Sequence, residues 1–356
     1  MKNISEYEFI IIGAGLSGAT LAFTLKHQFH KKVLLIDNDY SRSASLVAAG
    51  IFNPVTGKRM TKTWMADELF PTLHSFYPET EKIFNRHFFY NHTVIKPFDN
   101  IAEQNDWIAK SANPEYKNYI SVLSPQNDFV DTIKIPFGGI EIKQSGWLDC
   151  EKYLFSIKDY MADNQSFVSG KITNDNQGNI SFNGEKLEIG SFQKVVFCEG
   201  SQAAANPLWE KLPWRLTKGE VVILESETNI QNHIFNKSVF ICPTAQKNQY
   251  RAGATYIWDV FDNVPTQAGI AEIVKNLKEY YLVDFEIVKA HAEVRPTVER
   301  RRPFIGSHPK FSNLFIFNGF GSKTVSFAPY FSKHFAEHLL LGKELNREVE
   351  IIERFK

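Results

Sequence analysis

The apolar residues at the start of the chain form two short continuous runs separated by a helical pattern. Residues 8–12 consist of Glu8 and four apolar residues typical of a buried parallel strand, and residues 33–37 form a second such run that ends at Asp37. Residues 17–26, between the two runs, are rich in small residues and predict a helix. The sequence therefore predicts a βαβ unit at the N-terminus, which is typical of α/β folds.

The remaining pattern predicts further strands and helices. Residues 65–84 have helical spacing, which we expect to be broken at Pro71 and Pro78. Asp149 is a good N-cap for a helix that runs to about residue 163. The other expected elements are strands at 194–198, 286–293 and 314–317, a β-rich block at 218–256, an amphipathic helix through 270–277, and a final helix from about Val325 to just before Gly342 that tolerates Pro329 in its first turn.

Composition excludes several classes of protein. A chain of 356 residues is long enough for about two domains at roughly 150 residues each. Lys and Arg number 40 and Asp and Glu number 40, so the zero net charge predicts neither a nucleic-acid nor a membrane partner. The longest uncharged run, residues 9–25, contains three glycines and fits a strand, turn and helix better than a membrane span. We expect a globular protein, and the sequence does not specify its oligomeric state.

The cysteines and the N-terminus predict a location. Cys150, Cys198 and Cys242 form no C-x-x-C pair, and so sparse and odd a set suits buried thiols in a reducing compartment. Residues 1–8 carry one lysine and two glutamates, whereas a signal peptide begins with a basic, acid-poor segment. We therefore expect a cytoplasmic protein.

The turn between the first strand and the first helix carries the strongest chemical signal. Gly13, Gly15 and Gly18 match the pattern G-x-G-x-x-G, which allows a tight turn, a close approach of a pyrophosphate, and close packing of helix on strand. Asp37 ends the second strand, where a carboxylate can accept hydrogen bonds from ribose hydroxyls. This context predicts a dinucleotide site. It leaves NAD and FAD open because both contain the same ADP half, and a glycine turn without a ligand is the alternative.

Later segments decide between these cofactors. Their order and spacing resemble the D-amino-acid oxidase, glycine oxidase and sarcosine oxidase family of FAD-dependent amine oxidoreductases over nearly the whole chain. The segments that carry the resemblance are Ser43–Gly50, Gly146–Asp149, Val195–Gly200, Lys218–Glu220, Gly253–Thr255, Arg295–Thr297 with Pro303–Gly306, and Gly319–Lys323. The resemblance implies FAD, and we expect it to be noncovalent because the last of these segments contains no cysteine.

The resemblance also implies a fold and a reaction. The fold is α/β, or α+β overall, with a Rossmann-like FAD-binding domain interleaved with an antiparallel-sheet substrate domain. We expect residues 1–62, 145–212 and 292–356 to form the FAD-binding domain, and residues 63–144 and 213–291 to form the substrate domain. The implied reaction is oxidation of the C–N bond of an amino-acid-like or secondary amine by hydride transfer to the flavin, which gives an imine that hydrolyses.

Cofactor contacts follow from the same resemblance and from the glycine loop. They are expected at Gly13, Gly15, Leu16, Ser17, Gly18, Asp37, Asn38, Ser43, Ser45, Ala49, Gly50, Ile172, Cys198, Gly200, Gly319, Gly321, Ser322, Lys323 and Thr324.

Three residues are candidates for substrate chemistry. Arg295 is the expected anchor, because a guanidinium binds a planar carboxylate through two parallel hydrogen bonds; the alternative is a structural arginine paired with a core acid. Tyr256 is expected to line the pocket, either donating its hydroxyl or only packing. Lys323 precedes the last helix and could stabilise negative charge on the flavin, or it could be a solvated turn residue. Phe240 occupies a position where relatives have tyrosine, which makes the pocket more apolar.

One departure from the family widens the choice of substrate. The family often has an aspartate where this chain has Arg300, in the run Glu299-Arg300-Arg301-Arg302. With Lys58, Arg59 and Lys62, this run could form a basic rim for a larger anionic amine such as a modified nucleotide, or its arginines could simply be solvated. A non-catalytic flavin-binding protein is a further alternative.

A rival motif lies in the final helix. His334, Glu337 and His338 match the H-x-x-E-H pattern of zinc peptidases. The helix is already explained by its place behind the flavin turn, and no downstream helix clearly offers a third ligand. We therefore expect no metal ion.

Overall fold

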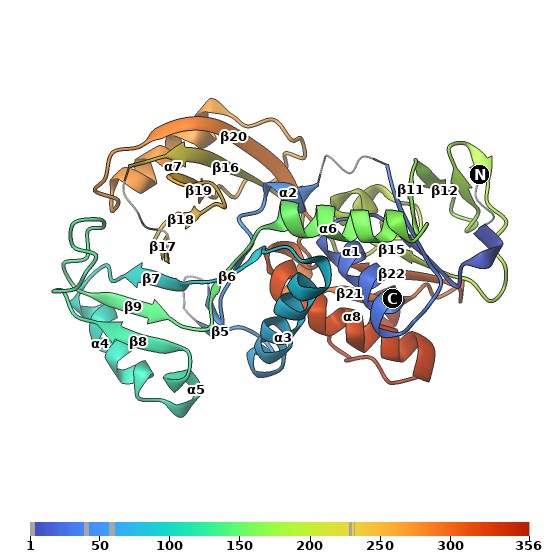
Figure 1. Cartoon of the computed structure of the whole chain (residues 1–356), viewed down its shortest axis with the longest axis horizontal. Coiled ribbons are helices and arrows are strands. Elements are labelled where there is room, and N and C mark those ends of the chain that lie inside the picture. The colour runs from blue at the N-terminus through green and yellow to red at the C-terminus, as the bar shows by residue number, and fades with distance from the viewer. Residues whose placement is uncertain (1–3, 39–42, 57–60, 228–229, 231, 356) are drawn as a thin grey trace.

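The protein, described by a computed structural model, consists of two large sheets that lie side by side (Figure 1). The structure describes residues 4–38, 43–56, 61–227, 230 and 232–355. No helix among these residues is long and apolar enough to cross a membrane.

The first sheet has six strands in the order β11-β2-β1-β15-β22-β21. All neighbouring strands are parallel except β21 and β22. Helices cover one face of this sheet, and the meander around Ile180 and Phe182 together with residues 208–212 covers the other. The central strands are therefore buried throughout, which explains their continuous apolar runs. The strands are β1 (Phe9–Ile12), β2 (Val33–Asp37), β11 (Phe167–Ser169), β15 (Lys194–Phe197), β21 (Phe304–Ser307) and β22 (Leu314–Asn318), which confirms the expected βαβ unit and buried strands.

Four helices pack around this sheet. Helix α1 contacts both α6 and α8, and α3 packs against α8. Asp149 caps α6 as predicted, since its side chain accepts a hydrogen bond from the Lys152 amide. Gly342 ends α8 in the left-handed conformation with φ 70°. The bounds are α1 (Leu16–Phe23), extended by a π-helical turn η2 (Thr24–Gln28), α3 (Ala66–Phe84), α6 (Cys150–Asp163) and α8 (Thr324–Leu341).

The expected break of the helix at Pro71 and Pro78 is wrong, because α3 runs through both prolines. Pro71 is exposed and Pro78 is half-buried, so water can hydrate the carbonyls that lack an amide partner. The opposite face of α3 is buried and holds the helix together. Pro329 lies in the second turn of α8 rather than the first, because the helix begins at Thr324. The carbonyl of Val325, which the missing Pro329 amide would have bonded, accepts instead from the Tyr77 hydroxyl at 3.0 Å.

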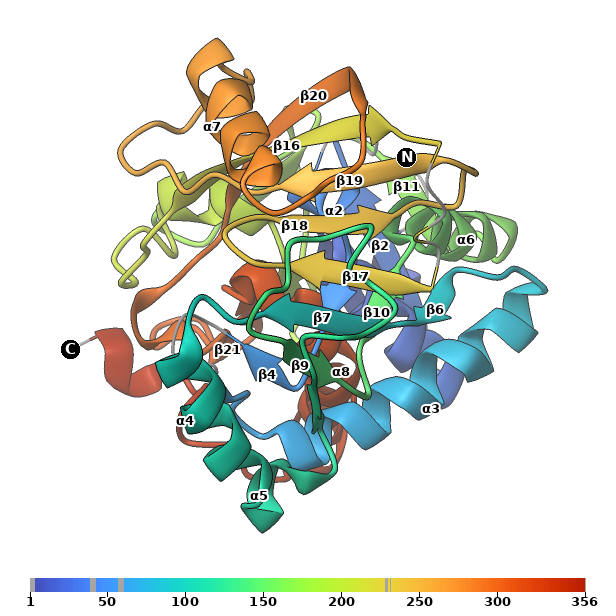
Figure 2. The same ribbon diagram turned by 90° about the vertical axis from the view of Figure 1, so that its left-hand side faces the viewer.

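The second sheet has eight strands in the order β20-β16-β19-β18-β17-β7-β9-β8 (Figure 2). Neighbouring strands are antiparallel except β17 and β7. Helix α7 (Gln267–Lys278) packs on one face through Ile273 and Leu277. The strands are β7 (Thr93–Pro97), β8 (Ile120–Leu123), β9 (Gly139–Ile142), β16 (Thr217–Glu225), β17 (His233–Asn236), β18 (Phe240–Pro243), β19 (Gln249–Gly253) and β20 (Glu286–Arg295), which confirms the β-rich block.

Smaller elements connect the two sheets. Strands β3 (Ile51–Phe52), β6 (Phe89–Asn91) and β10 (Gly146–Leu148) form a three-stranded sheet between them. The remaining elements are α2 (Ala44–Val47), α4 (Ile101–Ser111), α5 (Pro114–Lys117), the hairpin of β4 (Val55–Thr56) and β5 (Thr61–Lys62), and the meander of β12 (Ile172–Asn174), β13 (Ile180–Phe182) and β14 (Glu185–Lys186). The division of the chain into two interleaved domains stays a prediction.

Candidate active site

The residues expected to contact a cofactor gather at one edge of the six-stranded sheet. Strands β2, β1, β15 and β22 are parallel neighbours, so their carboxyl ends meet at the same edge. The chain leaves β1 toward α1 and β2, whereas β15 lies on the other side of β1. Crevices at such a reversal of strand order are the usual ligand sites of open α/β sheets. Asp37 and the loops beginning at Gly13, Cys198 and Gly319 therefore lie at the same edge of the sheet.

The glycine loop is shaped as the pattern predicts. Gly13 has φ 97°, and a Cβ atom there would lie 2.5 Å from the Cys198 carbonyl oxygen. A Cβ on Gly18 would lie 1.9 Å from the Gly13 oxygen, so neither position accepts a side chain. Gly15 differs, because the nearest atom to its Cβ position is Ser45 Oγ at 3.4 Å. The absence of a side chain at Gly15 thus leaves open the approach to the N-terminus of α1.

Two side chains bind the amides of this loop. Asp37 Oδ2 accepts a hydrogen bond from the Ala14 amide at 2.6 Å. Ser45 Oγ accepts from the Leu16 amide at 3.0 Å, which joins α2 to the start of α1. The first turn of a helix carries partial positive charge and favours anions such as a pyrophosphate. Ser17 is buried in this turn, and Ser43 precedes α2 in extended conformation.

The edge strand β11 lies beside the carboxyl end of β2. Ser169 pairs with Asp37, and the Gly170 amide donates to the Asp37 carbonyl at 2.9 Å. Ile172 follows two residues later and is half-buried, and Asn38 lies exposed directly after Asp37. This places both expected contacts beside the carboxyl end of β2.

Glu199 is a residue that the sequence reasoning missed. It lies between Cys198 and Gly200, which has φ 60°, in the loop after β15. Burial raises the pKa of the Glu199 carboxyl to about 7, and its Oε2 accepts from Asn206 Nδ2 at 2.8 Å. The sequence did contain a signal for Glu199, because this acidic residue lies directly between Cys198 and Gly200, two expected cofactor contacts.

The turn after β22 supplies a cation next to a helix N-terminus. Gly319 and Gly321 have φ 78° and 55°, and Thr324 Oγ1 donates to the Gly321 carbonyl at 3.0 Å. Ser322 is exposed, whereas Lys323 is half-buried. Burial, with a smaller contribution from Arg301, lowers the pKa of Lys323 to about 7.

The loop after α2 joins the two large sheets. Gly50 has φ 69°, and a Cβ there would lie 2.0 Å from the Leu148 carbonyl oxygen. On the eight-stranded sheet, Cys242 Sγ lies 4.0 Å from the Ala49 oxygen, and Arg251 Nη1 donates to the Ala48 oxygen. The expected second cofactor loop thus contacts the expected substrate sheet. Cys150, Cys198 and Cys242 are all buried free thiols, as predicted.

Arg295 lies at the end of β20 and its side chain crosses Gly219. A Cβ on Gly219 would lie 1.9 Å from Arg295 Nη2, so the glycine makes room for the guanidinium. Arg295 Nη1 donates to the Thr255 carbonyl at 3.2 Å, and the guanidinium stacks on Tyr256, 4.7 Å from the ring centre. Burial lowers the pKa of Arg295. No ion pair between Arg295 and a carboxylate occurs in the described part of the chain.

A family model for FAD-dependent oxidoreductases matches residues 8–338. The chain belongs to this family. FAD is therefore its cofactor, and the geometry just described has the features that FAD requires: a glycine loop at a helix N-terminus and a carboxylate at the end of β2.

Solved structures support the fold of this oxidoreductase. The chain is similar to a glycine oxidase from Geobacillus kaustophilus, with a TM-score of 0.80 and 16% identity over 98% of this chain and 97% of that chain. An iminodiacetate oxidase from Chelativorans sp. BNC1 has a TM-score of 0.79 and 17% identity over 97% of this chain and 98% of that chain. An L-proline dehydrogenase from P. horikoshii has a TM-score of 0.74 and 14% identity over 95% of this chain and 94% of that chain. The Rossmann-like fold class expected from the sequence is confirmed.

Part of the expected basic rim is used in local contacts of the oxidoreductase. Lys62 pairs with Asp67 at 2.6 Å, and Arg302 pairs with Glu348 at 2.9 Å while stacking on Trp64. Arg300 and Arg301 are exposed. Lys58 and Arg59 lie outside the described residues.

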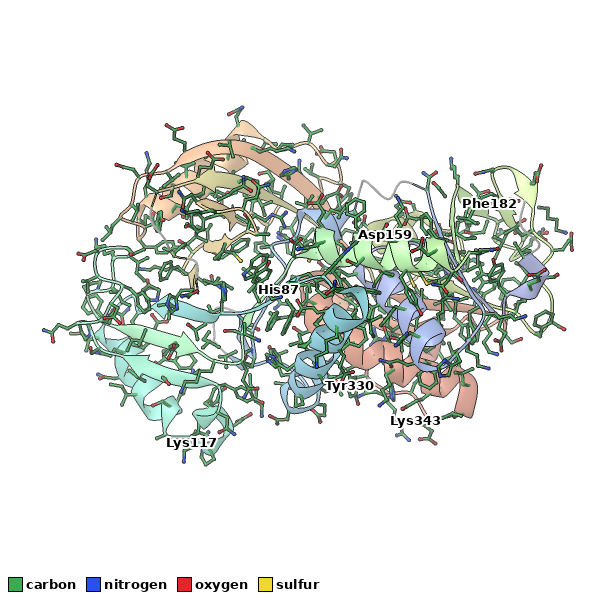
Figure 3. All side chains as sticks on the ribbon, in the orientation of Figure 1. His87, Lys117, Asp159, Phe182, Tyr330 and Lys343 are labelled. Atoms are coloured by element: carbon green, nitrogen blue, oxygen red, sulfur yellow. The ribbon has the colours of Figure 1, made fainter. Side chains whose placement is uncertain are left out.

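The three residues of the H-x-x-E-H motif make separate contacts near the end of α8. His334 Nε2 accepts from the Asn346 amide at 3.1 Å, and His338 Nδ1 lies 2.7 Å from the Lys343 oxygen. Glu337 pairs with Lys343 Nζ at 2.5 Å; Lys343 is labelled in Figure 3. These contacts hold the chain after α8 against the helix, and no group of three potential metal ligands occurs in the described ranges.

The lowered pKa of Lys323 predicts a titration near neutral pH. Because its pKa is about 7, the ammonium is charged below that pH and neutral above it, whereas ordinary lysines stay charged to about pH 10. Isotope-labelled dimethyl-lysine resonances of the apoprotein should include one that titrates near pH 7 and is missing in Lys323→Arg. If every lysine resonance titrated near its ordinary value, the described environment of Lys323 would be wrong.

Proposed function

We propose that this FAD-dependent oxidoreductase oxidises the C–N bond of a small amine that carries a carboxylate. The observation that carries the proposal is Arg295, a half-buried guanidinium with no acidic partner among the described residues, which lies on the sheet that meets the cofactor loop. A buried cation without a counter-charge is unfavourable unless an anion binds to it. A substrate carboxylate is the anion that suits a planar guanidinium.

The cofactor contacts proposed from the sequence agree with this arrangement. Gly13, Gly15 and Gly18 would place the pyrophosphate at the N-terminus of α1, and Asp37 would accept from the ribose. Ser43, Ser45, Ala49 and Gly50 would border the flavin from one side, and the residues after β22 from the other. We infer noncovalent binding because Gly319–Thr324 contains no cysteine.

Bound FAD supplies a hydride acceptor. Arg295 would bind the carboxylate and so orient the carbon next to it, while the stacked Tyr256 keeps the guanidinium in place. Phe240 is half-buried on β18 and would exclude water from the pocket. Lys323 and the N-terminus of α8 would add positive charge where negative charge develops during reduction.

The names of the similar proteins support the class of substrate. Glycine, iminodiacetate and L-proline, which appear in the names of those proteins, all combine an amine with a carboxylate. The buried free thiols are consistent with a cytoplasmic location, which belongs to the same proposal.

A screen under anaerobic conditions tests the proposed function. The FAD-loaded protein is mixed with glycine, sarcosine, D-amino acids and larger anionic amines, and loss of the visible flavin band is recorded. At least one carboxylate-bearing amine should bleach the flavin. If no amine did so while dithionite did, the protein would be the non-catalytic flavin-binding alternative.

A larger anionic amine, such as a modified nucleotide, is the second candidate. It is favoured by Arg300 and Arg301, which are exposed and follow Arg295 on the path to the flavin turn. Arg301 is close enough to Lys323 to help lower its pKa. Faster bleaching by nucleotide amines than by free amino acids would favour this candidate.

A further inference from the structure

The loop that joins β19 to α7 carries several large apolar side chains that are exposed (Figure 2). The exposed fractions are 65% for Tyr256, 56% for Trp258, 58% for Phe261 and 60% for Val264. Side chains so exposed bury little apolar surface, so hydrophobic packing does little to hold residues 256–264, here called the aromatic loop, in place. The position of this loop therefore depends on its polar contacts.

Lys218 of β16 supplies those contacts. Its Nζ donates to Asp262 Oδ1 and to the Val264 carbonyl, each at 2.6 Å. Its backbone also pairs with that of Ile257, amide to carbonyl in both directions, at 2.9 Å each. One lysine thus binds the aromatic loop near its start and at its end.

The environment of Lys218 is unusual for a lysine. Lys218 and its neighbour Glu220 are both buried, and the Lys218 Nζ lies 3.8 Å from Glu220 Oε1. Glu220 Oε1 also accepts from the Thr266 amide at 2.8 Å, and Gly269 lacks the Cβ atom that would overlap the carboxylate. Burying such groups is unfavourable unless each has its partners, so the loop and the start of α7 are tied closely to this part of β16.

The start of the aromatic loop contacts Arg295. Thr255 is held by β16, since its Oγ1 accepts from the Glu220 amide at 2.9 Å. The Thr255 carbonyl accepts from Arg295 Nη1 at 3.2 Å, and the Tyr256 ring lies against the guanidinium. The orientation of the guanidinium therefore depends on where the loop lies.

We propose that Lys218 is a positioning residue for substrate binding. Through its contacts with the aromatic loop, it keeps the Arg295 guanidinium oriented before the substrate carboxylate arrives. This inference rests on the proposed function, in which Arg295 binds that carboxylate. A side chain that is ordered in advance loses less entropy on binding, so the affinity rises without a new contact to the substrate.

The exposed partner of Lys218 allows a test that leaves the core intact. The Asp262 side chain is 53% exposed, so Asp262→Ala removes an acceptor of Lys218 and should keep the fold and the FAD content. The probe is methoxyacetate, which has a carboxylate and no amine, and the readout is the visible spectrum of oxidised FAD in the holoenzyme. The dissociation constant of the probe should rise about 5- to 50-fold in Asp262→Ala.

Matched variants separate this hydrogen bond from a general effect of charge. Asp262→Asn keeps an oxygen acceptor at the same place and should keep most of the affinity. Asp259→Asn removes another exposed acid of the same loop and should bind the probe like wild type; asparagine tolerates the φ of 62° there. Lys218→Met should weaken probe binding at least as much as Asp262→Ala, which carries the test if Lys218→Met does not fold.

A double-mutant comparison tests whether the effect passes through Arg295. With a carboxylate-bearing amine, Asp262→Ala should lower kcat/KM in the wild-type background and have little effect in the Arg295→Leu background, where the anchor is already absent. With an amine that lacks a carboxylate, Asp262→Ala should react like wild type. An equal loss in both backgrounds would mean that the loop contacts are only structural and would overturn the proposal.

Failure of this inference differs from failure of the proposed function. If methoxyacetate did not bind wild type, or bound wild type and Arg295→Leu equally, the carboxylate anchor itself would be wrong. If Arg295→Leu lost the probe while Asp262→Ala bound it within roughly twofold of wild type, Arg295 would remain the anchor and Lys218 would have no positioning role.

Discussion

Arg295→Leu is expected to keep FAD and to lower kcat/KM for carboxylate-bearing amines by about 30- to 3,000-fold. A charge-assisted pair in a pocket that excludes water contributes ~2–5 kcal/mol, and about 1.4 kcal/mol corresponds to a factor of ten. Leucine removes that pair and leaves the Thr255 carbonyl without its donor, but it does not touch the glycine loop. Stopped-flow measurement of anaerobic flavin reduction gives the rates and the substrate affinity.

Two comparisons make the Arg295 test specific. An amine without a carboxylate should be oxidised at a similar rate by wild type and variant, since it does not use the anchor. Arg300→Leu removes a nearby exposed arginine and should have little effect on small amino acids. Equal rates and affinities for wild type and Arg295→Leu with a carboxylate-bearing amine would return Arg295 to a structural role.

Gly15→Val is expected to give a folded protein that has lost FAD. The Cβ position of Gly15 has only Ser45 Oγ within 4 Å, so a side chain there meets little of the protein and projects instead toward the approach to α1. It would therefore block the pyrophosphate, whose affinity depends on close approach to the backbone. Circular dichroism measures the fold, and flavin absorbance after gel filtration measures the bound FAD.

Gly18→Ala is the informative contrast to Gly15→Val. Its new methyl group would lie 1.9 Å from the Gly13 oxygen, so the loss of FAD should come with a loss of stability. A folded Gly15→Val protein that retained FAD would mean that the pyrophosphate does not bind at this loop.

The sequence predicted elements whose pattern is local. The strands at Val33 and Leu314 are buried on both faces, so their side chains are continuously apolar and the pattern is clear. The path of α3 through two prolines was missed because it depends on burial of the opposite face and on the hydration of a few carbonyls, which are tertiary properties. The same limit applies to Pro329. The Val325 carbonyl, which lacks the amide that Pro329 cannot supply, accepts a hydrogen bond from Tyr77, 248 residues away in the sequence.

The parts of the candidate site that lie in contiguous sequence motifs were predicted. The parts that depend on how strands pair in the sheet were missed. The glycine loop and Asp37 were found from spacing alone. Gly219 was seen only as part of a short motif, because its role as space for Arg295 appears when β16 and β20 pair. Arg251 was not singled out, although its position two residues before Gly253 places it on the same strand face. The pKa of Lys323 is lowered by burial in the folded turn and by nearby Arg301. Both causes depend on the tertiary structure, so no local sequence pattern predicts them.

The visible spectrum of the purified protein, recorded before and after acid precipitation, tests most directly that the edge of the six-stranded sheet holds FAD without a covalent bond. The account predicts a yellow protein with equimolar flavin, and all of the colour in the acid supernatant as FAD. Colour that stayed in the pellet would contradict noncovalent binding. A colourless protein that took up no added FAD would contradict the cofactor site itself.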